Sequence, residues 1–304
     1  MSIDRTTIIK GPAKITFDSA TIFSEADIEV AFITDWFEVP TSAFGSLDRR
    51  VGSRRIEVSF IPKMWDNLAK LFPYATSQIG TAIFGATDKP LVITPANGAP
   101  LTLANAAVTQ LPGVTLSHGR PILRGMRFTC LCANNSNAAT AANWFSWGSV
   151  ATGVALTGFD LTKVPNTRYE LVRNSVTYRA EEGYSIDFSL GLAPDIVDGE
   201  GVVNYRITEL GATLRFLPTG KTEAEYATLL GWDGIGPGAA GAKHDAVITG
   251  AGSGAPIVTI IKTQVLQGGA AYGPERNRTG EVELACVRTQ TTGALDALWT
   301  FAEA

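Results

Sequence analysis

Hydrophobic and polar residues alternate along several segments of the chain. Ile56, Val58 and Phe60 are separated by charged or polar residues, and the same alternation runs over residues 184–192 and 126–132. A period of two places successive side chains on opposite faces of a strand. Turn-forming stretches such as residues 96–100, with the sequence ANGAP, join these segments. The pattern therefore predicts half-buried strands in antiparallel sheets.

Two other segments have the spacing of a helix. Both follow a strand that ends in Phe-x-Pro, at residues 60–62 and 216–218. The apolar residues that fall on one helix face are Met64, Trp65, Leu68, Leu71 and Phe72 in the first segment, and Tyr226, Leu229 and Leu230 in the second. Thr222 and Glu225 form a capping box at the start of the second helix, and Gly231 ends it. Residues 137–147 and 293–301 are candidates for two further short helices.

Large parts of the chain occur twice. Residues 91–103, LVITPANGAPLTL, return as residues 246–260, AVITGAGSGAPIVTI. Phe60 and Cys130 have counterparts in Phe216 and Cys286, and the separation is 156 residues in both pairs (216 − 60 and 286 − 130). The sequence therefore predicts a tandem duplication, with a first domain over residues 1–147, a connecting arm over 148–167 and a second domain over 168–304. We expect a mainly β fold in which each copy is a β-sandwich or partial barrel with one flanking α-helix.

Composition and charge exclude several classes of protein. The net charge is −4 without a basic stripe, which argues against a general nucleic-acid binder. No apolar run approaches the roughly 20 residues of a membrane-spanning helix, and the first twelve residues lack the apolar core of a signal peptide. Three cysteines are too few for the disulfide framework of a secreted chain of 304 residues. We therefore expect synthesis in a reducing cytoplasm and no membrane partner.

Candidate catalytic and metal-binding groups are sparse. The two histidines, His118 and His244, lie at non-equivalent positions of the two copies. Asp245 adjoins His244, but neighbours in an extended segment point to opposite faces, so its carboxylate is poorly placed to orient the ring. Cys130 and Cys132 share one strand face and are typical of core residues, without further Cys or His ligands nearby. We expect no catalytic, metal or cofactor site, and hence a protein that is not an enzyme.

The two copies differ most in one long segment. We expect a loop between the second and third strands of each copy, over residues 38–55 in the first and 193–206 in the second. The charges of these loops are opposite: the first carries Arg49, Arg50, Arg54 and Arg55, and the second carries Asp195, Asp198 and Glu200. Either the loops meet, within or between subunits, and give assembly its specificity, or both are solvated, since exposed ion pairs contribute little stability.

The order of these features resembles the tail tube proteins, or major tail proteins, of long-tailed bacteriophages. An amino-terminal arm ends in GPAKITFDSATIF, a long charged loop separates alternating strands, a Phe-x-Pro strand end leads into one helix, and a hairpin follows. The resemblance implies a β-sandwich with a flanking helix, six of which form a ring, and rings that stack into a hollow tube for DNA ejection. Members with a duplicated domain form trimers with pseudo-sixfold symmetry, and this chain is similar to that type.

The resemblance also implies partners and a location. The chain is expected to bind further copies of itself, other tail proteins at the tube ends and, inside the lumen, the tape measure protein and then DNA without sequence-specific contacts. Its expected location is the virion tail, after synthesis in the host bacterial cytoplasm. A conduit for DNA should not grip phosphates. By strand alternation the candidate lumen-facing positions are Glu57, Ser59, Asp187, Glu281 and Glu283, and ordinary outer-face positions fit the same pattern.

Two other classes fit parts of the sequence. Another tail structural protein, such as a terminator, baseplate or decoration protein, would share the β-rich composition and the sparse catalytic groups. A tandem carbohydrate-binding module would use exposed aromatic residues such as Trp36, Trp147 or Trp232. Trp144 and Trp299, at nearly matching positions of the two copies, are predicted core residues instead.

Overall fold

A computed structural model describes most of the chain. The described residues are 10–41, 45–63, 67–85, 87–117, 122–132, 140–157, 167–197, 200–219, 222–230, 241–252, 255–268, 270–272, 277–288, 290–291 and 294–303. Strands make up 64% of the structure and helices 6%, in two large antiparallel sheets, so the predicted mainly β fold is confirmed. Among these residues, no helix is long and apolar enough to cross a membrane.

The first sheet is built from strands of the first copy. In spatial order they are β2 (Ala20–Phe23), β1 (Lys10–Phe17), β5 (Lys89–Asn97), β6 (Leu101–Gln110), β9 (Met126–Cys130), β4 (Gly45–Phe60) and β3 (Glu29–Thr41), and β10 (Phe145–Trp147) also pairs with β6. The sheet curls over itself, because the ring of Phe17 on β1 lies 4.6 Å from the ring of Phe128 on β9 although β5 and β6 separate these strands. The amide nitrogen of Glu25 donates to the carbonyl oxygen of Ile61 at 2.8 Å, which joins the ends of β2 and β4 and completes a partial barrel.

The second sheet is closed more completely than the partial barrel of the first copy. In spatial order its strands are β11 (Tyr169–Arg173), β14 (His244–Gly250), β15 (Pro256–Gln267), β18 (Val282–Cys286), β13 (Gly201–Thr219), β12 (Val176–Val197), β7 (Val114–Leu116) and β8 (Ile122–Leu123), and β21 (Trp299–Glu303) pairs with β15. β12 also pairs with β11, so the strands from β11 to β12 form a closed circuit. Two small hairpins lie outside both sheets, β16 (Ala270–Tyr272) with β17 (Asn277–Thr279), and β19 (Gln290–Thr291) with β20 (Ala294–Leu295).

The pairing registers of the two copies coincide in their longest hairpins. Ala31 opposes Glu57 between β3 and β4, and 156 residues later (187 − 31) Asp187 opposes Thr213 between β12 and β13. A register shift follows Asp35 in the first hairpin, and one follows the counterpart glycine in the second. The repeat found in the sequence therefore extends to strand pairing and to the bulges that bend the strands.

The prediction of long loops over residues 38–55 and 193–206 is wrong. β3 reaches Thr41 and β4 begins at Gly45, while β12 reaches Val197 and β13 begins at Gly201. Each charged segment is therefore mostly the far end of a two-stranded hairpin. Neither segment has a regular alternation of apolar and polar residues in the sequence, yet strand pairing across each hairpin satisfies the backbone.

The helices are short. α1 (Leu68–Leu71) is a single turn that buries Leu68 and Leu71, and α2 (Glu223–Leu230) spans two turns. The predicted capping box is present, since the amide of Glu225 donates to the Thr222 hydroxyl at 3.3 Å and the Glu225 carboxylate accepts from the Thr222 amide at 3.0 Å. The sequence predictions for Met64, Trp65 and Gly231 lie outside the described residues.

The two predicted carboxyl-terminal helices are wrong. In residues 137–147 the described part contains one 3₁₀ turn, η2 (Ala141–Asn143), followed by the strand β10. In residues 293–301 the aromatic end belongs to β21. Both strands pair with an existing sheet, on β6 and on β15, and this tertiary pairing outweighs the helix propensity of the alanine-rich segments.

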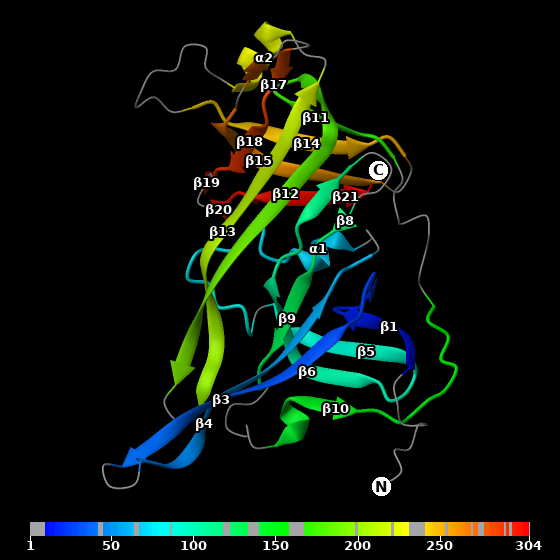
Figure 1. The fold of residues 1–304 in the computed structure, drawn as a ribbon, viewed down its shortest axis with the longest axis vertical. Helices are drawn as coiled ribbons and strands as arrows, with labels where there is room; N and C mark the ends of the chain where they lie inside the picture. Colours follow the sequence, from blue (N-terminus) through cyan, green and yellow to red (C-terminus); the bar gives the residue numbers. More distant parts are fainter. Residues whose placement is uncertain are drawn as a thin grey trace.

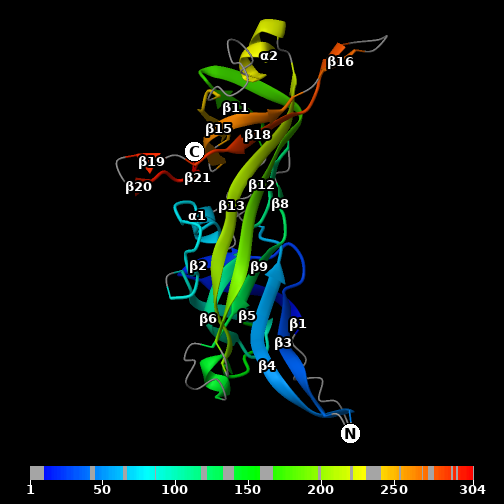
Figure 2. The ribbon, with the colours of Figure 1, turned by 90° about the vertical axis from the view of Figure 1, so that its left-hand side faces the viewer.

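The two copies lie one above the other along the long axis of the molecule (Figure 1). β12 and β13 run from the second copy down past the first, and the β3–β4 hairpin extends away from the opposite end (Figures 1 and 2). β7 and β8 belong to the first copy by sequence but extend the sheet of the second copy. One hydrophobic core therefore runs through both copies.

Candidate assembly surfaces

The first assembly surface is the junction at which the first copy extends the sheet of the second. β7 pairs antiparallel with residues 184–186 of β12, with Thr115 opposite Ser185. The apolar side chains at this junction are buried; they are Val114, Leu116, Tyr184 and Ile186. Gly183 has a φ of +99°, and a Cβ at this position would overlap the carbonyl oxygen of Leu116. Only glycine combines this backbone conformation with so close an approach.

A charged side chain fixes the same junction. The guanidinium of Arg124, just after β8, lies 2.6 Å from the carboxylate of Asp187 on β12. It also donates to the hydroxyl of Ser185 at 3.2 Å and to the carbonyl oxygen of Ile186 at 3.4 Å. The amide of Arg124 donates to the carbonyl oxygen of Gly113 at 2.7 Å, which closes the β7–β8 hairpin behind it. Because both charged groups are partly exposed, this contact contributes more to register than to stability.

A second contact between the copies lies on the β12–β13 hairpin. The amide of Gly80 donates to the carbonyl oxygen of Ile207 at 2.7 Å, and the amide of Ile207 donates to Thr81 at 3.0 Å. The side-chain amide of Asn204 makes two reciprocal bonds with the backbone of Phe84, both of 3.0 Å. The segment after α1 therefore adds to β13 much as a short strand would, and it fixes the relative orientation of the copies at a second point.

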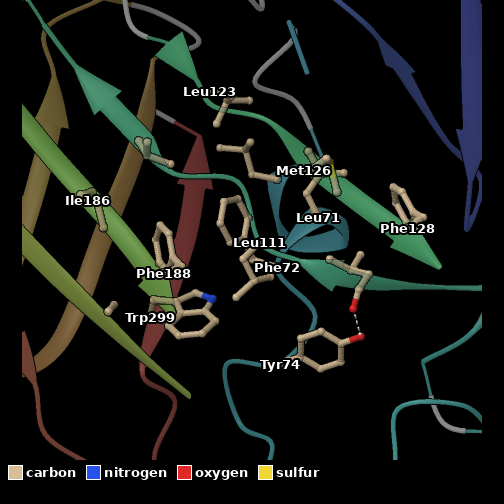
Figure 3. Close-up of a cluster of buried hydrophobic side chains, with 14 of the residues drawn as sticks. Leu71, Phe72, Tyr74, Leu111, Leu123, Met126, Phe128, Ile186, Phe188 and Trp299 are labelled. Carbon is tan, nitrogen blue, oxygen red and sulfur yellow. Dashed lines mark hydrogen bonds between the residues drawn. The ribbon is translucent and has the colours of Figure 1, made fainter. Parts of the chain in front are cut away.

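Aromatic rings of the two copies also pack against one another, and Figure 3 shows Phe72 beside Phe188 and Trp299. The ring of Phe72, just after α1, lies 4.7 Å from Phe188 on β12 and 4.5 Å from Phe301 on β21. Phe188 in turn packs edge-on against Trp299 at 5.0 Å. These separations are typical of favourable aromatic pairs. We call Phe72, Phe188, Trp299 and Phe301 the aromatic cluster; it joins the first copy to the second.

Arg55 and Asp195, one in each long hairpin, form ion pairs within their own hairpin. Arg55 lies 2.7 Å from Asp35 and 2.9 Å from Glu57. A hydrogen bond from the Ser53 hydroxyl and the charge of Arg55 lower the pKa of the Asp35 carboxyl, and the bond to Glu57 raises the pKa of Arg55. In the second copy Asp195 pairs with Arg206 at 2.8 Å.

The remaining candidates of these hairpins are exposed or undescribed. Arg50, Arg54 and Glu200 are exposed, while the side chain of Arg49 and all of Asp198 lie outside the described residues. The hairpins of the two copies do meet within the chain. Gly201 of β13 has a φ of +78°, and a Cβ there would overlap the carbonyl oxygen of Gly52 on β4. Burial raises the pKa of Tyr205 on β13, and the charges of Arg55, Glu57 and Asp35 also act on it. Charge complementarity between the hairpins of different subunits stays a prediction.

Four of the candidate lumen-facing residues lie opposite the core on their strands, namely Glu57, Ser59, Asp187 and Glu283. The three carboxylates among them each have an arginine nearby. Arg215 lies between Asp187 at 3.4 Å and Glu283 at 3.2 Å, and the bond to Glu283 raises its pKa. Glu57 lies 3.5 Å from Arg127. Ser59 lies on the same face of β4, and Glu281 is exposed just before β18. The structure therefore gathers the acids of the second copy around one arginine and places Glu57 in a separate group.

The described candidates for chemistry, His244, Asp245 and Cys130, have surroundings that account for their contacts and pKa directions. The carboxylate of Asp245 accepts a hydrogen bond from the backbone amide of Lys262 at 2.9 Å, an arrangement in which it stabilises the backbone. Burial, with the charges of Arg173 and Lys262, lowers the pKa of His244. Burial raises the pKa of Cys130 to about 11, so its thiol is protonated at neutral pH. Within the described ranges no three His, Cys, Asp or Glu side chains are placed to hold a metal ion; His118 lies outside them.

The most important contact residues are absent from the sequence predictions. The pattern of Val114, Thr115 and Leu116 alternates, but three residues are too few to separate a strand from a loop. The segment over residues 80–84 carries no periodicity at all. The available signal is divergence between the copies, because residues 270–272, the counterpart of β7, read Ala-Ala-Tyr.

In comparisons with known proteins, no family model matches the chain, and no curated protein matches its sequence.

Proposed function

We propose that the protein is a structural virion protein whose chains form the stacked rings of a long, non-contractile phage tail tube. Each chain fills two positions in a ring, so three chains make a pseudo-hexamer around a conduit for DNA. The junction of β7 with β12 is the observation that supports this proposal most directly. Through it one copy extends the sheet of the next, which is the relation expected between neighbouring members of a ring.

The contact between the copies is heterologous, because the β7 side of one copy meets a different surface, the β12–β13 side, of the other. Repetition of such a contact generates a closed ring when the rotation closes, and an open helix when it does not. The strand junction, the contact of residues 80–84 with β13 and the aromatic cluster fix the rotation at three points. A fixed rotation favours a single closed ring size.

The charge on the candidate lumen face suits a DNA conduit. Arg215, Arg124 and Arg127 each lie beside a carboxylate. An arginine that is already paired with an acid contributes little net attraction to phosphate, whereas each unpaired cation would add salt-dependent affinity for DNA. The face is therefore expected to let a nucleic acid slide past without holding it.

Negative-stain electron microscopy and light scattering of the purified protein test the proposal. We expect rings with a central hole that grow into tubes as the concentration rises. Reversal of Arg49, Arg50 and Arg54 to glutamate should block this growth without lowering the unfolding midpoint. Arg55 is left unchanged in this variant because it pairs with Asp35 and Glu57. A matched control reverses Arg168 and Arg179 on the second copy, which should assemble normally.

Three results would contradict parts of the proposal. A monomer at every concentration that binds glycans would indicate a carbohydrate-binding module. Single rings that never stack would indicate another tail component, such as a terminator. Normal tube growth of the arginine-reversed variant would remove the charged hairpin from the assembly surface.

A further inference from the structure

The β16–β17 hairpin is the counterpart of the β7–β8 hairpin, because 156 residues separate Val114 from Ala270 and Leu116 from Tyr272 (270 − 114 and 272 − 116). Its pairing differs. β7 adds to β12, whereas β16 pairs only with β17 among the described strands. Figure 2 shows this hairpin projecting from the end of the molecule far from the amino terminus. One of the two equivalent hairpins therefore has a strand to extend, and the other has none within its own chain.

The strand edge that would accept it is open in the first copy. β7 covers residues 184–186 of β12, and the counterparts are residues 28–30 at the start of β3 (184 − 156 and 186 − 156). β3 is the last strand of its sheet, with β4 as its partner in the described structure. Beside it lies a groove of about 720 Å³, lined in part by Ile28, Val30, Phe32 and Trp147. An unpaired edge beside an apolar groove is a surface that proteins normally cover.

Side chains at equivalent positions of the two copies differ in exposure, which shows that the first copy lacks a covering segment that the second copy has. Phe188, in the aromatic cluster, is 9% exposed, but its counterpart Phe32 is 53% exposed. Ile207 is 0% exposed under residues 80–81, but its counterpart Val51 is 39% exposed. Phe32 packs edge-on against Phe145 at 5.1 Å, and the counterpart pair, Phe188 and Phe301, lies 6.0 Å apart with tilted rings. The same surface therefore exists twice in the chain, once covered by the first copy and once uncovered.

We propose that a second copy of this chain covers it, by adding its β16–β17 hairpin to the β3 edge of its neighbour. The register is that of the β7–β12 junction, with 156 added to the residue numbers of β7 and 156 subtracted from those of β12. Thr115 opposite Ser185 becomes Ala271 of one chain opposite Glu29 of the next. The proposal deepens the proposed function and rests on it for ring closure. The contact itself follows from the internal repeat.

Charge and local sequence refine the contact. Residues 270–279 of the donor carry two arginines and one glutamate, a net charge of +1, and residues 25–30 of the acceptor carry three acids, a net charge of −3, so the two segments have opposite charge. Asp27 stands where the second copy has Gly183, and it does not share the positive φ of that glycine. The backbone before residue 28 therefore follows a different path, and we expect the pairing between chains over residues 28–30 without the close approach seen at Gly183. In the internal contact Phe72 packs against Phe188. The counterpart of Phe72 is Thr228, so we expect a different side chain of the neighbouring chain to pack against Phe32.

Engineered disulfides test the register. Directly opposed strand residues lie within reach of a disulfide. The pair Thr115→Cys with Ser185→Cys is the internal control and should crosslink within one chain. The pair Glu29→Cys with Ala271→Cys should crosslink only between chains, giving dimers and trimers on a non-reducing gel. The out-of-register pair Glu29→Cys with Ala270→Cys, and the parent chain with its native cysteines, should stay monomeric on the gel.

A side-chain variant gives an independent test. Phe32→Asp places a charge in the groove and removes the ring contact with Phe145. We expect it to abolish association while the single chain stays folded, because Phe32 is 53% exposed there. Val150→Asp, at a residue that is 64% exposed and outside the groove, is the matched control and should associate like the parent. Association of Phe32→Asp at parental strength would overturn the proposal.

The outcomes separate this inference from the proposed function. If rings form but the Glu29–Ala271 pair gives no crosslink between chains, the hairpin contact is wrong and the tube proposal stands. If that pair crosslinks but microscopy shows open fibres without rings, the contact stands and the ring proposal fails. If no crosslink between chains forms at any concentration, or the out-of-register pair reacts equally well, the hairpin contact is overturned.

Discussion

Truncation of Phe72 tests whether the aromatic cluster holds the two copies together. Phe72 is buried, and two of its ring partners, Phe188 and Phe301, belong to the other copy at 4.7 and 4.5 Å. Burial of roughly 150–200 Å² of ring at about 25 cal/mol per Å² gives about 4–5 kcal/mol, and measured Phe→Ala losses in cores are about 3–5 kcal/mol. We therefore expect Phe72→Ala to lose about 3–5 kcal/mol of unfolding free energy, mostly from the contact between copies.

The result that distinguishes this contact from other core contacts is that the two copies no longer unfold together. In urea, we expect the parent to unfold in one transition and Phe72→Ala to unfold in two, with the β7 amides losing hydrogen-exchange protection first. Phe60→Ala is the control, because Phe60 is equally buried but stacks on Phe128 within the first copy at 6.0 Å. It should lose comparable free energy with protection of β7 lowered no more than elsewhere. A loss below about 1 kcal/mol, or coincident transitions in Phe72→Ala, would refute this reasoning.

Three further predictions follow from named contacts. Arg173 is buried and donates to Thr263 and to the carbonyl oxygen of Leu229 on α2, so Arg173→Met should lose about 3 kcal/mol in urea titration, while the exposed Arg179→Met changes little. His244 has a lowered folded pKa, so protonation favours the unfolded chain; stability should decline as pH falls below about 6.5, and His244→Gln should flatten that decline. Neutralising the partners of Arg215 with Asp187→Asn and Glu283→Gln should raise DNA retention at low salt in a filter assay.

Each of these three predictions has an outcome that would contradict it. Equal stability of Arg173→Met and Arg179→Met would mean that the buried guanidinium does not anchor α2. A parental pH profile in His244→Gln would assign the acid-side loss to other groups. DNA retention that does not rise in the doubly neutralised chain, or that ignores salt, would remove Arg215 from the candidate lumen face.

Sequence patterns predicted the fold where side chains alternate between core and solvent. Ile56, Val58 and Phe60 became a buried strand face, and the capping residues of α2 formed their reciprocal bonds. Patterns failed where backbone pairing alone defines a strand. The arginine-rich end of β4 and the acidic end of β12 have little alternation, and ladder bonds across each hairpin order them all the same.

The assembly surfaces were harder to predict than the fold. Local sequence indicates that residues 114–116 could form a strand, but not which sheet receives it. That choice depends on Gly183, far along the chain, and on residues 80–84 meeting β13. Comparison of the copies still carried information, because Phe32 and Phe188 are the same residue type at equivalent positions with very different exposure. A duplicated sequence thus provides an internal reference for which surfaces are completed.

The crossing of β7 into the second sheet also sets an order for biosynthesis. Leu116 leaves the ribosome 68 residues before its partner Tyr184 (184 − 116), a delay of roughly 3–14 s at about 5–20 residues per second. During this interval the nascent first copy carries a hairpin edge and apolar side chains with no sheet to join. The amino-terminal half is therefore not a self-sufficient unit on the ribosome, and its maturation depends on translation continuing into β12. Selection on such a chain acts on both halves together, so neither half can be lost without leaving the other incomplete.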